Sequence, residues 1–194
     1  MSHWAKREAY RIDKSRTLLR PTLPEQSGGI WADVGCGDGI FTSALHTLLT
    51  ADQTIYGVDK NERALQALQR NFAESYPAAN LQTIRADFTR PLSLPPLDGL
   101  LLANSLHFVR EKQPVLAHLT ALLKPTGRLI IVEYNTNRGN YAVPYPFDED
   151  AFVELAESVG LSRAWIAAKV PSRFLGEMYA GVAMRKALGS LNGA

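Results

Sequence analysis

Residues 31–39 read WADVGCGDG and decide the fold of this chain. The apolar run 30–34 leads into them and helical spacing follows, so the glycines occupy a strand-to-helix turn, the context that gives such a motif meaning. Glycine is used where the backbone needs positive φ or where a ligand must lie directly on the main chain. Because Gly35, Gly37 and Gly39 stand at alternate positions, we predict a loop without side-chain cover across which a large ligand lies.

An acidic residue at the end of the next apolar run adds to this pattern. The run YGVD ends at Asp59, about 20 residues beyond the glycine loop, where a carboxylate can accept both hydroxyls of a ribose. Asp59 would also serve as a helix N-cap, a role equally open to Asn61. Ile40 stands where a dinucleotide fingerprint needs a small residue, so we expect a nucleoside ligand without a pyrophosphate.

Short apolar runs alternate with helical spacing along most of the chain. The predicted strands are 30–34, 54–58, 81–85, 97–103, 128–134, 162–170 and 178–184, and the predicted helices are 41–49, 61–76, 115–123 and 148–159. Such alternation requires crossover connections and therefore a mainly parallel sheet. The short connection around 171–176 indicates a closing hairpin. We therefore predict an α/β, Rossmann-like, doubly wound, mostly parallel seven-stranded sheet with an antiparallel last strand and helices on both faces.

The first residues of the chain differ in character from the rest. Residues 1–20 mix apolar and many charged side chains and end before Pro21, which is typical of an exposed amphipathic helix. We expect this segment to be a mobile helical lid, with 21–194 forming the Rossmann-like domain. A helix of this kind would equally pair with another subunit, and the sequence does not indicate the oligomeric state.

Composition is that of an ordinary globular protein. The chain has 194 residues, of which 46% are apolar and 21% are charged, and its net charge is +2. Its basic residues are dispersed rather than clustered, so nucleic-acid binding is not expected. One cysteine and four scattered histidines predict no metal site. Without a membrane-spanning run or a leader pattern, we expect a cytoplasmic protein.

Four segments together resemble the class I S-adenosylmethionine-dependent methyltransferases. They are 33–39, the ribose acid Asp59, the ADF run at 86–88, and the region from 98 to 107 continued by LLKPTGRL at 122–129. The resemblance implies S-adenosylmethionine as cofactor and a methyl-transfer activity. It assigns to cofactor binding Asp33, Gly35, Cys36, Gly37, Gly39, Asp59, Lys60, Asp87, Phe88 and Asn104. Asp87 would receive the adenine amine, although an acid before Thr89 is often simple turn chemistry.

The acceptor is expected just after the fourth strand. The polar and aromatic run that base-modifying relatives carry there is missing, and Cys36 lies elsewhere, so cytosine C5 chemistry is not expected. His107 is either a general base, since neutral imidazole takes protons near pH 7, or a packed histidine at a helix entrance. The segment 134–147 is long and aromatic enough for a substrate wall. The predicted acceptor-binding residues are Tyr10, His107, Tyr134, Arg138, Tyr141 and Tyr145.

These observations predict transfer of a methyl group to an O, N or C atom of a small molecule, because no extra domain is available to hold a macromolecule. Cofactor chemistry of this type needs few catalytic side chains, so the lack of a catalytic triad does not argue against an enzyme. Two alternatives stay open: a nucleotide-dependent oxidoreductase and a non-catalytic adenosylmethionine-binding protein. A cofactor-binding measurement distinguishes a methyltransferase from an oxidoreductase. A turnover measurement distinguishes a methyltransferase from a non-catalytic binding protein.

Overall fold

The computed structural model describes residues 3–50 and 52–186, with side chains from residue 9 onward. The strands are β1 (Ile30–Val34), β2 (Thr54–Asp59), β3 (Asn80–Arg85), β4 (Leu97–Ala103), β5 (Leu123–Tyr134), β6 (Leu161–Ser172) and β7 (Gly176–Arg185). The helices are α1 (His3–Leu19), η1 (Arg20–Thr22), α2 (Ile40–His46), α3 (Glu62–Ser75), η2 (Leu106–Phe108), α4 (Lys112–Thr120) and α5 (Glu149–Ser158), where η marks a 3-10 helix. Each predicted strand and helix is therefore present, with shifted ends.

The strands form one sheet in the order β3-β2-β1-β4-β5-β7-β6. Strands β1 to β5 pair in parallel, whereas β7 runs antiparallel to both of its neighbours, β5 and β6. The predicted seven-stranded sheet with an antiparallel last strand is confirmed. The order reverses at β1, since chain connections run outward to β2 on one side and to β4 on the other. Ligands of open α/β sheets bind at such a switch point, beyond the carboxyl ends of the strands.

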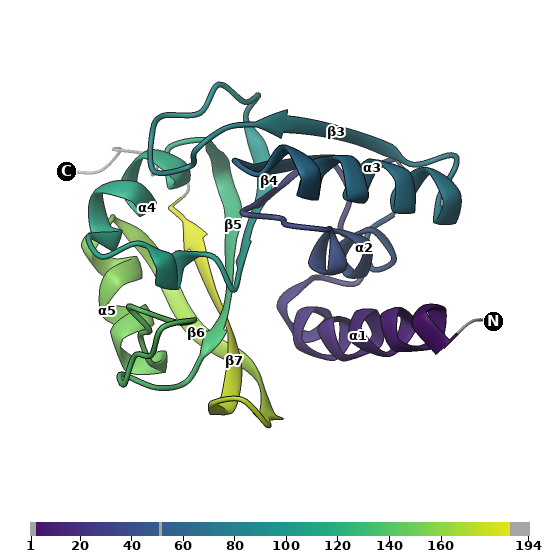
Figure 1. The fold of residues 1–194 in the computed structure, drawn as a ribbon. Helices are drawn as coiled ribbons and strands as arrows, with labels where there is room; N and C mark the ends of the chain where they lie inside the picture. The colour runs from purple at the N-terminus through teal and green to yellow at the C-terminus, as the bar shows by residue number, and fades with distance from the viewer. Residues whose placement is uncertain (1–2, 51, 187–194) are drawn as a thin grey trace.

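Helices cover both faces of the sheet (Figure 1). Helices α1 and α2 pack on one face, through a cluster that includes Leu19, Leu45 and Ile130. Helices α4 and α5 pack on the other face, through a cluster that includes Leu116 and Phe152. The central strands are buried on both faces, which explains their near-continuous apolar sequences.

The largest difference from the prediction concerns the start of β5, which begins at Leu123 rather than at residue 128. Leu123 pairs with Leu97 of β4, and the register then shifts before Gly99 pairs with Arg128. This irregularity keeps the KPTG stretch within the strand, although its residues resemble a turn. Helix α4 correspondingly lies earlier than predicted, because Pro114 is tolerated in a first helical turn.

The end of α1 belongs to the core. Leu18 and Leu19 are buried against the face that α2 also covers, and Ser15 is buried one turn earlier. Pro21 lies in the 3-10 turn that follows and ends the α-helix, as predicted. The lid stays a prediction, and any movement of it would be limited to the part of α1 before Ser15, because displacing two buried leucines would open the core.

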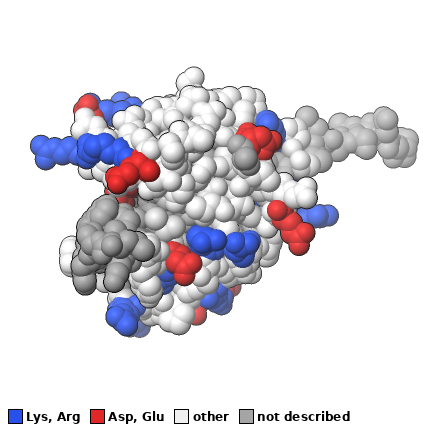
Figure 2. Space-filling model, turned by 90° about the vertical axis from the view of Figure 1, so that its right-hand side faces the viewer, with Lys and Arg blue, Asp and Glu red and all other residues white. Residues whose placement is uncertain are grey.

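Surface charge is mixed on the face shown in Figure 2. Lysine and arginine side chains lie there singly or beside acidic ones, with no continuous basic patch of the kind that binds nucleic acid. Among the residues that the structure describes, no helix combines the length and the apolar character that crossing a membrane requires.

Candidate functional site

A cleft with two lobes lies where β1, β2 and β4 end. The first lobe, of about 310 Å³, lies between α1 and the glycine loop and includes Tyr10 and Gly37 in its lining. The second lobe, of about 500 Å³, lies beyond β2 and β3 and includes Asp59. Gly35 and Asn104 line both lobes, so the two adjoin at the switch point of the sheet. The ends of the strands thus bring together residues from four separate parts of the chain.

The three glycines of the loop all have positive φ: 77° at Gly35, 56° at Gly37 and 91° at Gly39. A Cβ at Gly35 would lie 2.4 Å from Ser105 Cβ, and one at Gly39 would lie 2.2 Å from Leu68 Cδ1. A Cβ at Gly37 would meet no atom within 4 Å. Packing as well as conformation therefore requires Gly35 and Gly39, and the loop is open to a ligand at Gly37.

Asp59 fixes this loop from the neighbouring strand. Its Oδ2 accepts a hydrogen bond from the Gly37 N–H at 2.9 Å, and its Oδ1 accepts one from the Asn61 N–H at 2.8 Å. Asn61, not Asp59, is the N-cap of α3, with its side chain accepting from Arg63 N and Ala64 N. The carboxylate of Asp59 is thus available to the second lobe, next to Lys60, which lines the same lobe.

The opposite wall of the second lobe contains Asp87 and Phe88. Asp87 Oδ1 accepts hydrogen bonds from the Thr89 N–H and Oγ1–H, and these bonds lower the pKa of the Asp87 carboxyl. Asp87 therefore stabilises the turn at Thr89, as the sequence allowed, and it also lines the second lobe. The second carboxylate oxygen of Asp87 makes no hydrogen bond to the described residues, so it can accept one from a ligand.

Asn104, between the two lobes, is held in an unusual state. Its φ of 52° is in the left-handed region, which few residues other than glycine adopt. Its Oδ1 is buried and has no hydrogen-bond partner among the described residues. A buried acceptor without a donor costs free energy, and strain of this kind gathers at ligand sites. A ligand that donates a hydrogen bond at the junction of the lobes would satisfy it.

Asp33 and Gly39, both predicted to bind cofactor, do not line the cleft. The Asp33 side chain is fully buried beneath the loop, where its Oδ2 accepts from Thr42 Oγ1–H at 2.6 Å. Burial raises the pKa of Asp33 to about 7, against the lowering effect of the Thr42 hydrogen bond. The residue supports the loop from below. Cys36 does line the first lobe, and burial raises the pKa of its thiol, as expected for a space-filling cysteine.

His107 is buried at the end of the same sheet edge and forms a pair with Glu133. Its Nδ1 lies 2.6 Å from Glu133 Oε2, and Glu133 Oε1 accepts the backbone N–H groups of Leu106 and His107. Nε2 makes no hydrogen bond to the described residues and is not among their fully buried unpartnered atoms. The carboxylate thus fixes the orientation of the ring and leaves Nε2 available. His107 lines neither lobe, and its side chain is 3% exposed.

The structure distributes the other predicted acceptor residues unevenly. Tyr10 lines the first lobe, and Tyr134 packs beside His107 with ring centroids 6.2 Å apart. Arg138 lies in a separate polar hollow with residues at the start of α5, and Tyr141 is 96% exposed. Tyr145 packs against Lys112, with the Lys112 Nζ 5.9 Å from the ring centroid. These six residues do not line a single pocket among the described residues, and their part in binding the acceptor stays a prediction.

Sequence reasoning missed Glu133, Ser105 and the pairing of Arg11 with Asp38. Glu133 escaped notice although its position carries a signal: a carboxylate that directly follows the buried apolar run 129–132 needs a buried partner. Ser105, whose Oγ–H donates to Val34 O at 2.9 Å, links the loop after β4 to β1. Arg11 and Asp38 form an exposed ion pair across the first lobe, 3.8 Å apart, between two segments whose proximity only folding creates.

Comparison with known proteins gives the family. A family model described as a methyltransferase domain matches residues 32–129, which is half of the chain and includes both lobes' principal residues. The chain belongs to the methyltransferase domain family. The resemblance to class I S-adenosylmethionine-dependent methyltransferases is thereby confirmed.

Individual methyltransferases show how far the similarity extends. The ribosomal protein L11 methyltransferase of Thermosynechococcus vestitus is 36% identical over 125 residues, which cover 60% of this chain and 35% of that protein. The chain thus spans about a third of the length of this relative. The YcgJ protein of Bacillus subtilis has a TM-score of 0.70 at 12% identity, covering 90% of this chain and 99% of that one. The N-methyltransferase NodS of Bradyrhizobium japonicum, in complex with S-adenosyl-L-homocysteine, has a TM-score of 0.70 at 14% identity over 89% of this chain and 86% of that one.

The cleft of this methyltransferase domain fits the cofactor of its family. S-adenosylmethionine has a ribose with two hydroxyls, an adenine amine and an amino-acid end with a free ammonium. The cleft offers a carboxylate at Asp59, a second acceptor at Asp87 and the unpartnered Asn104 Oδ1. The open space over Gly37 admits a ligand directly onto the main chain. Donors on the ligand and acceptors on the protein are therefore complementary.

The buried Asp33 predicts how the stability of this methyltransferase domain depends on pH. Its pKa is raised, so the folded state retains a proton that the unfolded chain releases, and stability falls as pH rises from about 4 to about 7. Asp33→Asn keeps an acceptor for Thr42 and removes the titration. We expect the variant to exceed the wild type at pH 8 by about 1–4 kcal/mol, the range set by a shift of up to three pKa units.

Urea unfolding at pH 5 and pH 8 measures this difference. Asp38→Asn, which changes an exposed carboxylate of the same loop, is the matched control and should show no such gain. Equal pH dependence in the wild type and in Asp33→Asn would show that Asp33 is ionised throughout, and the assignment of a proton to it would fail.

Proposed function

We propose that the protein is an S-adenosylmethionine-dependent methyltransferase that acts on a small-molecule acceptor. The observation that carries this proposal is the junction of the two lobes, where the glycine loop, the Asp59 carboxylate and the unpartnered Asn104 Oδ1 meet. Each is an acceptor or an open backbone surface, and together they suit a nucleoside that carries an ammonium group.

Each lobe has a distinct part in this proposal. In the second lobe, Asp59 accepts the ribose hydroxyls, while Asp87 and Phe88 hold the adenine. In the first lobe, the main chain at Gly37 and the amide of Asn104 hold the amino-acid end. When bound, the cofactor supplies an activated methyl group on a sulfonium. The protein then has to orient the acceptor and, where the acceptor carries a proton, remove it.

His107 is the proton acceptor in this scheme, and Glu133 is its positioning residue. With Nδ1–H donated to the Glu133 carboxylate, Nε2 carries the lone pair and can take a proton from a hydroxyl or an amine. The same carboxylate stabilises the imidazolium that forms, as in the acid-histidine pairs of hydrolases. The two backbone N–H groups that also donate to Glu133 hold it in place.

A small acceptor is favoured by the size of the site. The two lobes measure about 310 Å³ and 500 Å³, which is the size range of small-molecule sites. Several methyltransferases with this fold, including the O-methyltransferase cnsE of Penicillium expansum, are named for reactions at different atoms, so the methylated atom is not assigned. A nucleotide-dependent oxidoreductase and a non-catalytic adenosylmethionine-binding protein are the alternatives that the following tests separate.

Removal of the ribose acid tests the placement of the cofactor. Asp59→Ala should weaken binding of S-adenosyl-L-homocysteine by about 1–3 kcal/mol, because charge-assisted hydrogen bonds to the ribose are lost. Asp87→Ala should cost less, because Asp87 would accept one hydrogen bond from the adenine amine whereas Asp59 would accept two from the ribose hydroxyls. Isothermal titration calorimetry measures both affinities, and thermal melting confirms that the variants fold. Binding of a nicotinamide dinucleotide in place of S-adenosyl-L-homocysteine would overturn the assignment in favour of an oxidoreductase.

The His107–Glu133 pair is tested by exchanging the carboxylate for an amide. In Glu133→Gln, the amide oxygen still accepts the backbone N–H groups, whereas its NH₂ faces His107 Nδ1 and drives the ring proton to Nε2. Nitrogen-15 NMR of the imidazole should therefore show Nδ1–H in the wild type and Nε2–H in the variant. With an acceptor in hand, Glu133→Gln and His107→Ala should each slow single-turnover transfer about 10²–10⁴-fold with unchanged cofactor affinity. A normal rate in His107→Ala would remove the base from the mechanism.

The first part of α1 is proposed to close over the first lobe as a lid. Support comes from Arg11, which reaches Asp38 of the glycine loop across the lobe, and from Tyr10, which lines the lobe but is largely exposed. Closure would shield the reacting groups from water. Because Leu18 and Leu19 are core residues, the hinge would lie near Ser15.

Limited tryptic proteolysis tests the lid. Cleavage after Arg11 and Lys14 should become several-fold slower when S-adenosyl-L-homocysteine is bound, whereas cleavage after the exposed Arg70 of α3 should not change. Equal cleavage at all of these sites with and without ligand would reject the lid. Protection that depends on protein concentration rather than on ligand would instead indicate that α1 contacts a second subunit.

A further inference from the structure

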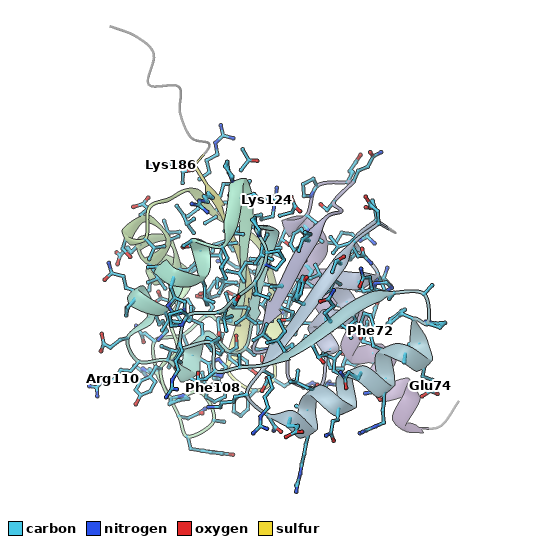
Figure 3. The ribbon with its side chains drawn as sticks, turned by 90° about the horizontal axis from the view of Figure 1, so that it is seen from above. Phe72, Glu74, Phe108, Arg110, Lys124 and Lys186 are labelled. Carbon is cyan, nitrogen blue, oxygen red and sulfur yellow. The ribbon has the colours of Figure 1, made fainter. Side chains whose placement is uncertain are left out.

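Exposed aromatic side chains gather at the carboxyl edge of the sheet. Phe108 is 59% exposed and Phe174 is 51% exposed, and both follow strand ends at this edge, after β4 and after β6. Figure 3 shows Phe108 at the opposite end of the sheet from Lys124, which is near the start of β5. Leaving large apolar rings in water is unfavourable, so such a cluster marks a surface that contacts something else.

Four rings form a continuous row along this edge. Phe108 packs on His107 with ring centroids 4.3 Å apart, His107 is 6.2 Å from Tyr134, and Tyr134 is 5.7 Å from Phe174. We refer to these four residues as the aromatic row. They come from η2, the end of β5 and the turn between β6 and β7.

The row continues the cleft and includes the imidazole with the free Nε2. Phe108 also lines the second lobe, so one end of the row borders the region assigned to the cofactor. Tyr134 is half-buried, and burial together with the Glu133 charge raises the pKa of its phenol, so it stays neutral and presents a ring rather than an anion. A molecule lying on the row would meet the exposed rings of Phe108 and Phe174, and His107, which is 3% exposed, packs directly on Phe108.

From this arrangement we propose that the methyl acceptor is a flat aromatic molecule that carries an acidic hydroxyl group, of the phenol type. The inference rests on the proposed function and specifies its acceptor class. Ring stacking on Phe108, Tyr134 and Phe174 provides affinity for a planar molecule without demanding specific hydrogen bonds. An aliphatic chain or a sugar has no flat ring, so it could not stack on the aromatic row.

The chemistry of the base agrees with a phenol. A phenolic hydroxyl ionises near pH 10, several units below an aliphatic hydroxyl, so proton transfer to an imidazole is far less uphill. His107 Nε2 takes the hydroxyl proton, the oxygen forms a bond to the methyl carbon, and the methyl–sulfur bond breaks with its electron pair left on sulfur. The products are an aryl methyl ether, a protonated imidazole and the neutral thioether, so charge and atoms balance.

A matched pair of probes tests the class of acceptor. In the presence of S-adenosyl-L-homocysteine, ligand-observed NMR is expected to show binding of 2-naphthol at least 10-fold tighter than that of decahydro-2-naphthol, which has the same carbon skeleton without a flat ring. With S-adenosylmethionine, mass spectrometry should detect 2-methoxynaphthalene. Equal affinity for the two probes would overturn the proposal.

Two variants locate the probe on the row. Phe174→Leu keeps an apolar side chain but loses the ring, and it should weaken 2-naphthol binding about 2- to 10-fold. Trp165→Leu, which changes another exposed aromatic residue on β6 outside the row, is the control and should leave binding unchanged. Equal effects of both variants, or no effect of Phe174→Leu, would contradict the assignment.

Two further measurements distinguish the sources of a failure. If S-adenosyl-L-homocysteine binds but 2-naphthol does not, the aromatic-acceptor proposal fails while the proposed function stands. If S-adenosyl-L-homocysteine itself does not bind, the proposed function fails. Light scattering on the wild type and on Phe174→Leu reports a third outcome: a dimer that dissociates in the variant would show that the row is a contact between copies of this chain, and the proposal would be overturned.

Discussion

The site depends on the hydrogen bonds that fasten the glycine loop to the end of β2. The N–H groups of Gly35 and Cys36 both donate to Val58 O, and the Gly37 N–H donates to the Asp59 carboxylate. These bonds hold three residues of positive φ in one path, with the main chain open at Gly37. Asp59 both shapes the loop and lines the second lobe, so the same carboxylate would set loop geometry and the proposed recognition of the ligand.

The parallel pairing of β1 with β2 and β4 makes that fastening possible. Parallel strands end at one edge of the sheet, so residues distant in sequence arrive together there. Ser105, which follows β4, donates to Val34 O and blocks any side chain at position 35. The two sides of the cleft are thus joined by direct contacts, and the lobes adjoin instead of forming separate pockets.

A second unit at the same edge is built around the buried Glu133. It accepts two backbone N–H groups of η2 and the ring of His107, which gives a buried carboxylate enough partners to remain buried. The aromatic row lies across this unit. The edge thus combines a polar half, where we propose that the cofactor binds, with an aromatic half that contains His107, a division that suits the proposed reaction between a polar cofactor and a flat, apolar acceptor.

The sequence by itself determined the alternation of strands and helices, the antiparallel last strand, the glycine loop and the position of Asp59 at a strand end, because these follow from local periodicity, backbone sterics and spacing. It also pointed to His107 without choosing between two roles. Only the tertiary structure decided that Asp33 lies beneath the loop, that Tyr141 and Arg138 face away from the cleft, and that Glu133 orients His107. Those outcomes depend on contacts between residues far apart in the chain, and no local pattern encodes which side chains the folding of the sheet brings into contact.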